Sequence, residues 1–172
     1  MAHGIGVVIT ERITLATVKE HELTSALRVS PEDASIADSL QGVPAELIVQ
    51  RIVGEIKQLG MKEPPSHIGI GMPGIIRNGI VEDSPNLVQF KGTHMGQLVS
   101  DAVQPLFGSV PVSIFNDADV MAAGVAATRG HLDRLIRVWT LGTGIGFGRY
   151  PSNGGVWEAG HSVVSLDPKE QF

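Results

Sequence analysis

Residues 109–124 read SVPVSIFNDADVMAAG, in which a short apolar run passes through Asn116 and Asp117 into a segment of small residues. The run 110–115 predicts a buried strand, and 117–130 predicts the helix behind it. Ligands usually bind at the carboxyl ends of strands in open α/β sheets. The amino end of the helix would keep Asp117 ionised, so its carboxylate could accept a proton from a substrate hydroxyl. Asn and Asp are also preferred helix caps, so a purely structural role is the alternative, and the pair by itself favours it.

Outward from this stretch, helix and strand patterns alternate. Residues 43–61 predict an amphipathic helix that ends at Gly60, residues 67–72 a buried strand, and residues 95–107 a second helix. Between them, 74–83 predicts a hairpin that turns at Asn78-Gly79. The stripe predicted to face the core from the first helix consists of Leu47, Ile48, Ile52, Val53, Ile56 and Leu59.

The amino-terminal region predicts three antiparallel strands at 4–10, 13–19 and 23–29. Followed by alternating helices and strands, they indicate an α/β fold with a mixed five-stranded sheet. A further hairpin begins near residue 137, on either side of a glycine-rich turn. We therefore expect a first lobe over 1–135 and the beginning of a second lobe over 136–172.

The composition narrows the functional classes. The chain has 172 residues, of which 42% are hydrophobic, and a net charge of −5, so we expect a folded protein that does not bind nucleic acid. It has no cysteine, which excludes disulfides and cysteine metal sites. No 18-residue apolar run and no signal peptide are evident, so we expect no membrane span and a cytoplasmic location.

Glycines alternate with other residues over 140–148, TLGTGIGFG. Successive backbone N–H groups in such a turn can surround a phosphate. The segment lacks the Gly-Lys-Ser/Thr of a P-loop, and a strand follows it where a dinucleotide fingerprint needs a helix. Glycines that serve only the packing of a hairpin are the alternative.

Two further places offer polar side chains to a ligand. Glu158 and His161 are three residues apart in WEAGH, where Gly160 lets the backbone turn between them. Asn86 follows Pro85 in a turn-forming segment, DSPNL. An ordinary surface pair and an ordinary loop are the alternatives, and we expect no metal site at either place.

The segments 68–92, 112–130, 140–148 and 154–161, in this order, resemble the ROK family (repressor, open reading frame, kinase), which includes bacterial glucokinases and other sugar kinases. The resemblance extends from about residue 67 to about residue 164. It implies the actin-like, ribonuclease-H-like ATPase fold, with two lobes around a cleft.

The resemblance also implies roles for the candidate residues. Asn116 would hold sugar hydroxyls, and Asp117 would be the base for the hydroxyl that is phosphorylated. Asn86, Glu158 and His161 would bind further hydroxyls of a hexose. Gly142, Thr143 and Gly144 would form the second phosphate-binding turn, facing ATP that binds with magnesium.

The sequence departs from the family at the first phosphate-binding turn. Family kinases have Asp-x-Gly-Gly-Thr between the first two strands, whereas this chain has Glu11 and Arg12 there, in GIGVVITERITL. A carboxylate in that turn without the glycines would repel phosphates. The cysteines of the family's zinc loop are also missing, so a zinc ion on His161 is not expected.

These departures argue against catalysis by this chain and leave three functions open. The first is an ATP-dependent hexose kinase, and the second is a sugar-binding or sensing module without catalysis. The third is a degenerate half-kinase that dimerises, because exposed apolar residues such as Trp139, Phe147 and Trp157 would need covering. A homodimer is the expected assembly.

Overall fold

The computed structural model describes residues 3–33, 35–36, 39–141 and 145–152. The chain forms two compact units, Met1–Asp117 and Ala118–Phe172, which we call the first and second unit and describe separately. The lobe boundary expected after residue 135 stays a prediction. Among the residues described, no helix combines the length and apolar character that crossing a membrane requires.

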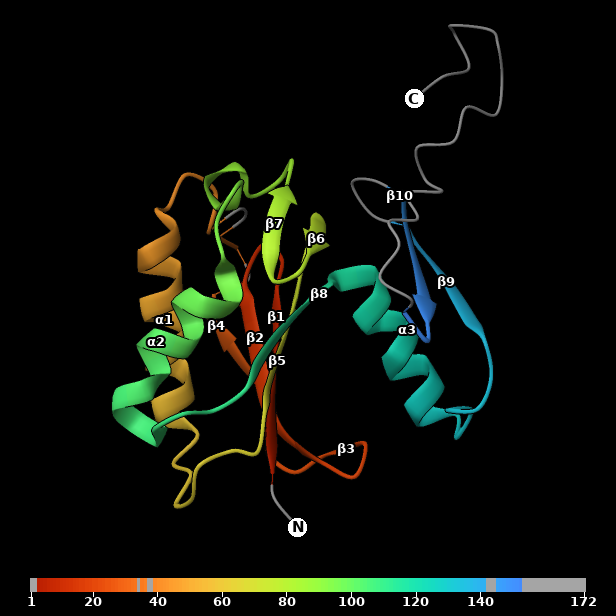
Figure 1. Ribbon diagram of the computed structural model, residues 1–172, viewed down its shortest axis with the longest axis horizontal. Coiled ribbons are helices and arrows are strands. Elements are labelled where there is room, and N and C mark those ends of the chain that lie inside the picture. Colours follow the sequence, from red (N-terminus) through yellow and green to blue (C-terminus); the bar gives the residue numbers. More distant parts are fainter. Residues whose placement is uncertain (1–2, 34, 37–38, 142–144, 153–172) are drawn as a thin grey trace, which may run out of the picture. The chain divides into compact units, whose positions relative to one another are not determined.

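A mixed six-stranded sheet forms the centre of the first unit, with the order β3-β2-β1-β5-β8 and with β4 also paired to β2 (Figure 1). Strands β1, β5 and β8 are parallel, and β2 is antiparallel to its neighbours. The strands of this sheet are β1 (Gly4–Ile9), β2 (Ile13–Lys19), β3 (Glu22–Leu23), β4 (Arg28–Ser30), β5 (Ile68–Met72) and β8 (Val112–Asn116).

The predicted third strand is thus two short strands, β3 and β4, and the sheet has six strands instead of five. Side-chain hydrogen bonds explain the interruption. The backbone N–H of Thr17 donates to the hydroxyl of Ser25 over 3.0 Å, in place of a backbone carbonyl. Serine and threonine hydroxyls compete with sheet ladders in this way.

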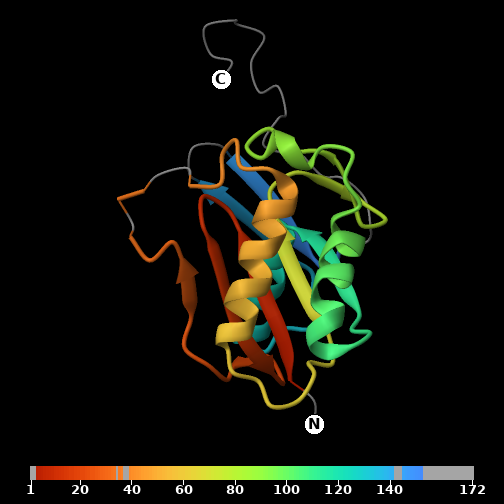
Figure 2. The same cartoon turned by 90° about the vertical axis from the view of Figure 1, so that its left-hand side faces the viewer.

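Two helices, α1 (Ala45–Gln58) and α2 (Met95–Phe107), cover one face of this sheet (Figure 2). The predicted stripe of α1 needs two corrections, because Leu47 is 46% exposed whereas Val49 is buried. Val49 is four residues from Ala45 and three from Ile52, and this spacing places it on the core-facing side of the helix. Helix α1 ends as expected, with Gly60 at φ 63° just beyond it.

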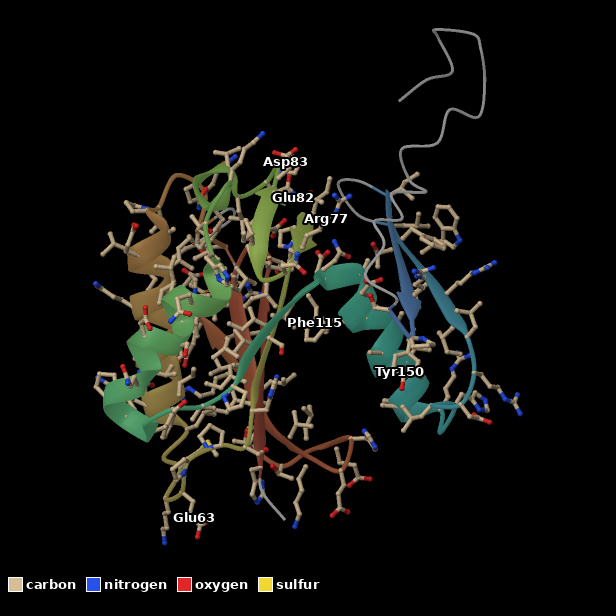
Figure 3. The ribbon with its side chains drawn as sticks, in the orientation of Figure 1. Glu63, Arg77, Glu82, Asp83, Phe115 and Tyr150 are labelled. Carbon is tan, nitrogen blue, oxygen red and sulfur yellow. The ribbon has the colours of Figure 1, made fainter. Side chains whose placement is uncertain are left out.

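The hairpin of β6 (Ile75–Arg77) and β7 (Ile80–Asp83) follows β5, and a short 3₁₀ helix, η1 (Val88–Phe90), follows the hairpin. Asn78 and Gly79 have φ values of 51° and 76°, which confirms the predicted turn. Two ion pairs lie in this region, Arg77 with Glu82 at 3.6 Å and Asp83 with Lys91 at 2.9 Å. Arg77, Glu82 and Asp83 are labelled in Figure 3.

The second unit contains most of α3 (Asp117–Thr128) and a hairpin of β9 (Ile136–Leu141) and β10 (Ile145–Tyr150). Trp139 and Phe147 face each other across the two strands, with ring centroids 4.9 Å apart in an edge-to-face arrangement. Trp139 nevertheless remains 55% exposed, as expected, whereas Phe147, which was also expected to be exposed, is half-buried.

Close packing explains two of the alternating glycines, Gly148 against α3 and Gly146 against the neighbouring strand β9. A Cβ at Gly148 would overlap the backbone of Ala118, and one at Gly146 would overlap the hydroxyl of Thr140. Asp119 stabilises the contact between α3 and β10, because its carboxylate accepts hydrogen bonds from the Arg149 N–H (2.9 Å) and the Ser152 hydroxyl (3.0 Å). For Gly146 and Gly148, packing is therefore the role that the structure supports.

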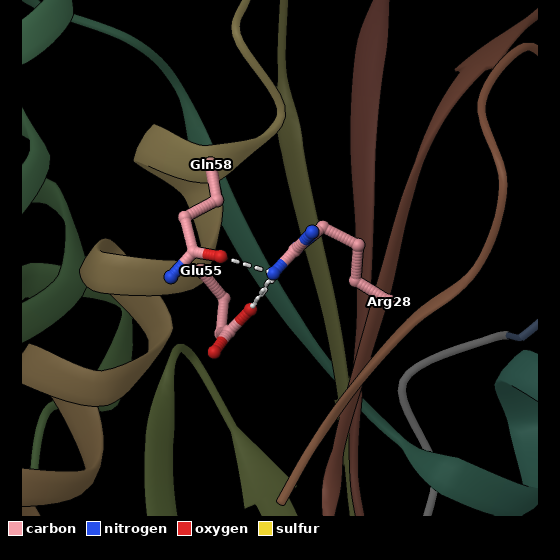
Figure 4. A network of polar contacts seen from close by, with 3 residues as sticks. All are labelled: Arg28, Glu55 and Gln58. Atoms are coloured by element: carbon pink, nitrogen blue, oxygen red, sulfur yellow. Dashed lines mark hydrogen bonds and ion pairs between the residues drawn. The ribbon is translucent and has the colours of Figure 1, made fainter. Parts of the chain in front are cut away.

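A polar network ties β4 to α1 (Figure 4). The guanidinium of Arg28 donates to Glu55 from Nε (3.1 Å) and from one terminal nitrogen (3.0 Å), and that nitrogen also donates to Gln58. The side chains of Arg28 and Glu55 are 31% and 15% exposed, so solvent screens this pair only in part.

We expect Arg28→Ala to lower the free energy of unfolding by about 1 kcal/mol, because it removes a partly screened, charge-assisted pair. Urea unfolding of Arg28→Ala, Glu55→Ala and the double variant would measure the coupling energy. Additive losses would show that the pair contributes nothing to stability.

Candidate functional site

The site is built at the carboxyl ends of the parallel strands of the first unit. Asn116 is the last residue of β8, opposite Met72 at the end of neighbouring β5, and Asp117 begins α3. Strand β1 runs parallel to β5, so the turn from β1 to β2 lies at the same edge of the sheet. The location expected for Asn116 and Asp117 is confirmed by this topology.

A tight loop, Pro73–Gly74, leads from β5 into the hairpin and contacts Asn116. The side-chain Nδ2 of Asn116 donates to the Gly74 carbonyl over 3.0 Å. Gly74 has a φ of 126°, and a Cβ there would overlap the carbonyl oxygen of Asp83. Only glycine fits this backbone conformation and this approach of two chain segments.

Asn86 lies at the tip of a turn that is anchored to the same loop. The turn closes through the Leu87 N–H, which donates to the Ser84 carbonyl over 3.2 Å, so Pro85 and Asn86 form its two central residues. Ser84 is fully buried, and its hydroxyl donates to the Pro73 carbonyl over 2.8 Å. Asn86 itself is exposed. The structure therefore connects both predicted ligands, Asn86 and Asn116, to Pro73–Gly74.

The turn from β1 to β2 is closed by the chain's own groups. The Thr10 N–H donates to the Arg12 carbonyl over 3.0 Å, and the Ser39 hydroxyl donates to the Glu11 carbonyl over 2.8 Å. The side chain of Glu11 is exposed. An exposed carboxylate on a turn without glycine does not suit the binding of phosphate.

Asp33 is the first aspartate of the sequence and does not replace the family's aspartate in that turn. Its carboxylate accepts hydrogen bonds from the Ser35 hydroxyl (2.7 Å) and N–H (2.9 Å). These bonds, the side-chain one first, hold the pKa of Asp33 below its usual value. Asp33 therefore stabilises its own loop. Among the described residues, no cluster of three or more His, Asp or Glu side chains could hold a metal ion.

The other predicted site residues lie outside the described part of the chain. These are Gly142, Thr143 and Gly144 of the second phosphate turn, and Glu158 and His161. Their roles stay predictions.

Sequence reasoning did not single out Gly74 or Ser84. The dipeptide Pro73-Gly74 after a buried strand is a turn signal that could have drawn attention to Gly74. Nothing in the local sequence of Ser84 indicates that its hydroxyl reaches a carbonyl eleven residues away.

A groove of about 590 Å³ opens elsewhere on the first unit, between the β6–β7 turn, the start of α2 and strand β8. His94, Gln97 and Ser113 are among its lining residues, together with Phe115, which is labelled in Figure 3. The lining includes none of Asn86, Asn116 and Asp117, so this groove is not the predicted sugar site.

Known proteins resemble this chain in sequence and in fold. No family profile matches it, but it is 34% identical to a glucokinase from Thermotoga maritima over 135 residues. That match covers 76% of this chain and 38% of the glucokinase, so the chain spans well under half of this relative's length.

Two solved structures share the fold, each with a TM-score of 0.70. The polyphosphate/ATP-glucomannokinase of Arthrobacter sp. strain KM is 22% identical, with 94% of this chain and 64% of the kinase covered. The ROK family glucokinase of Streptomyces griseus, solved with glucose and AMPPNP, is 24% identical, with 96% and 52% covered. These matches confirm the actin-like, ribonuclease-H-like ATPase fold. The likeness to a glucokinase in sequence and to sugar kinases in fold agrees with the resemblance to the ROK family, and the chain spans only part of the length of these proteins.

Proposed function

We propose that this chain carries the hexose-binding site of a sugar kinase, with Asn116 and Asp117 at its centre. The observation that carries this proposal is the contact of Asn116 with the Gly74 carbonyl at the carboxyl edge of the sheet, directly before Asp117. Hydroxyl-rich ligands need several convergent donors and acceptors, and amide and carboxylate groups provide both. Asn86 extends the site from the neighbouring turn, and Glu158 and His161 complete it by family resemblance.

In the kinase function, Asp117 accepts the proton of the sugar hydroxyl whose oxygen attacks the terminal phosphate of ATP, and ADP leaves. Phosphoryl transfer depends mainly on positioning and on neutralising phosphate charge. Gly142, Thr143 and Gly144 would supply backbone N–H groups to those phosphates. The relationship to a glucokinase and the fold shared with a nucleotide-bound family member support ATP as the phosphoryl donor.

A second function, sugar binding without catalysis, is favoured by one observation. The turn that binds phosphate in family kinases is here the Glu11-Arg12 turn, and Ser39 holds the Glu11 carbonyl. Without a first phosphate turn, the chain would bind hexose and leave it unmodified. The two functions share the sugar site and differ only in the response to ATP.

Calorimetric titration with glucose and mannose, combined with an ADP-release assay with ATP and magnesium, tests both functions. Hexose binding with ADP release supports the kinase, and binding without ADP release supports the sugar-binding module. Absence of binding to every hexose would refute both.

We also propose that the chain is a cytoplasmic homodimer. Exposed apolar side chains on the second unit, among them Trp139 and Leu141 at 55% and 81% exposure, support association. Light scattering that finds a monomer at high protein concentration would contradict the dimer.

A further inference from the structure

We propose that Ser84 is a positioning residue, which sets the orientation of the Asn116 side-chain amide through the Pro73–Gly74 loop. The positioning itself is a property of the free protein. Its consequence for sugar affinity rests on the proposed function, in which Asn116 binds the hexose.

The first link of the connection is the hydrogen bond from Ser84 to Pro73. Ser84 is 0% exposed, and its hydroxyl donates to the Pro73 carbonyl over 2.8 Å. This hydrogen bond is part-buried, with Ser84 buried and Pro73 half-buried, so water replaces the lost donor only in part and its loss is costly. This bond therefore holds the peptide unit between Pro73 and Gly74 in one position.

The second link is the close packing of Gly74 against the end of β7. A Cβ on Gly74 would lie 3.0 Å from the Cβ of Ser84 and 3.1 Å from its Cα, and would overlap the Asp83 carbonyl. The loop thus rests directly on the Asp83–Ser84 backbone, with no room between the two segments. Because the packing and the hydrogen bond act on adjacent residues, together they determine where the Gly74 carbonyl points.

The third link is the amide of Asn116. Its Nδ2 donates to the Gly74 carbonyl over 3.0 Å, across 42 residues of sequence. A flipped amide would bring Oδ1 against that carbonyl, where two acceptors repel each other. The Gly74 carbonyl therefore favours the orientation in which Nδ2 of Asn116 faces the loop.

Ser84 also anchors the second predicted ligand. Its carbonyl accepts the Leu87 N–H that closes the turn carrying Asn86. Ser84 thus connects two turns. Its hydroxyl bonds the loop that contacts Asn116, and its carbonyl closes the turn that carries Asn86. Of the two attachments, only the bond to Pro73 depends on the serine side chain.

Nuclear magnetic resonance of the ligand-free protein tests the positioning directly. The Asn116 side-chain amide signals are identified by their loss in Asn116→Asp. In Ser84→Ala, we expect these signals to shift and their hydrogen exchange to accelerate roughly fivefold, the effect of losing a hydrogen bond of ordinary strength. Ser113→Ala is the matched control. Ser113 lies on strand β8, as Asn116 does, but its hydroxyl is hydrogen-bonded to His67 and not to the Pro73–Gly74 loop. Its Asn116 signals should keep their wild-type exchange rate.

If Ser84→Ala does not fold, Ser84→Cys replaces it in the same measurement. The thiol is a weak donor of similar size, so the Asn116 signals should shift in the same direction by a smaller amount. Unchanged Asn116 amide signals in either folded variant would overturn the positioning role, whether or not the protein binds sugar.

Glucose titration then links the positioning to the proposed function. Ser84→Ala should weaken binding about fivefold, and the Ser84→Ala/Asn116→Ala double variant should bind no more weakly than Asn116→Ala alone. If Ser84→Ala lowered glucose affinity by the same factor in the wild-type and the Asn116→Ala proteins, its effect would be general structural damage, and the inference would be overturned. A wild-type protein that binds no hexose would refute the proposed function, and the ligand-free spectra would still decide the role of Ser84.

Discussion

Replacing Asp117 by alanine should weaken hexose binding by about 10- to 100-fold, the loss expected for a hydrogen bond to an ionised group of about 1.5–3 kcal/mol. The same variant should show no ADP release, because no base remains at the end of β8. Calorimetry with glucose measures the first effect, and the coupled ADP assay measures the second.

Two further variants separate the roles of the carboxylate. Asp117→Asn keeps a hydrogen-bonding side chain of the same shape but cannot accept the proton, so we expect turnover to fall by about 10²- to 10⁴-fold while glucose affinity changes little. Asp101→Ala is the matched control, because Asp101 is an exposed aspartate on α2 that accepts from Gln97.

Because an aspartate at the start of a helix can also act as a cap, we expect Asp117→Ala to lower the stability of the protein by about 1 kcal/mol. Thermal melting of the variant and the wild type measures this loss. If Asp117→Ala binds glucose as tightly as wild type, Asp117 has only the structural role and the proposed site is wrong.

Gly74→Ala should lower the free energy of unfolding by about 2–5 kcal/mol, from an unfavourable positive φ and the repacking that a new Cβ requires. The backbone of Gly74 has a φ of 126°, and the added methyl would overlap the Asp83 carbonyl. The displaced loop would also move the carbonyl that binds Asn116, so hexose affinity should fall as well. Urea unfolding and glucose titration measure the two effects.

Gly54→Ala provides the matched control for this substitution. Gly54 lies within α1, and a Cβ there would meet no atom within 4 Å. Alanine has the higher helix propensity, so this variant should be more stable than wild type by up to about 1 kcal/mol. Equal stability of Gly74→Ala and wild type would show that the loop adapts without cost, and would weaken the case that Gly74 determines the position of Asn116.

Local patterns in the sequence were sufficient for most of the secondary structure. Helix α1 with its end at Gly60 and the turn at Asn78-Gly79 were predicted. The strand predicted as buried over 110–115 forms over Val112–Asn116, with only Ile114 buried. Such features depend on the spacing of apolar residues and on backbone preferences within a few residues, which the sequence displays directly. The order of these elements also carried the resemblance to the ROK family, and hence the fold.

Only the tertiary structure decided how the site is held together. The bonds from Ser84 to Pro73 and from Asn116 to Gly74 join residues 11 and 42 positions apart, and no local preference predicts such contacts. Packing likewise decided that Gly148 allows α3 and β10 to approach and that Gly146 makes room for Thr140 of β9, whereas the sequence alone left phosphate binding equally possible. The sequence by itself thus determined which polar residues end the strands. Chain packing determined their orientation, because a side chain is oriented by whichever distant groups the fold brings into contact with it.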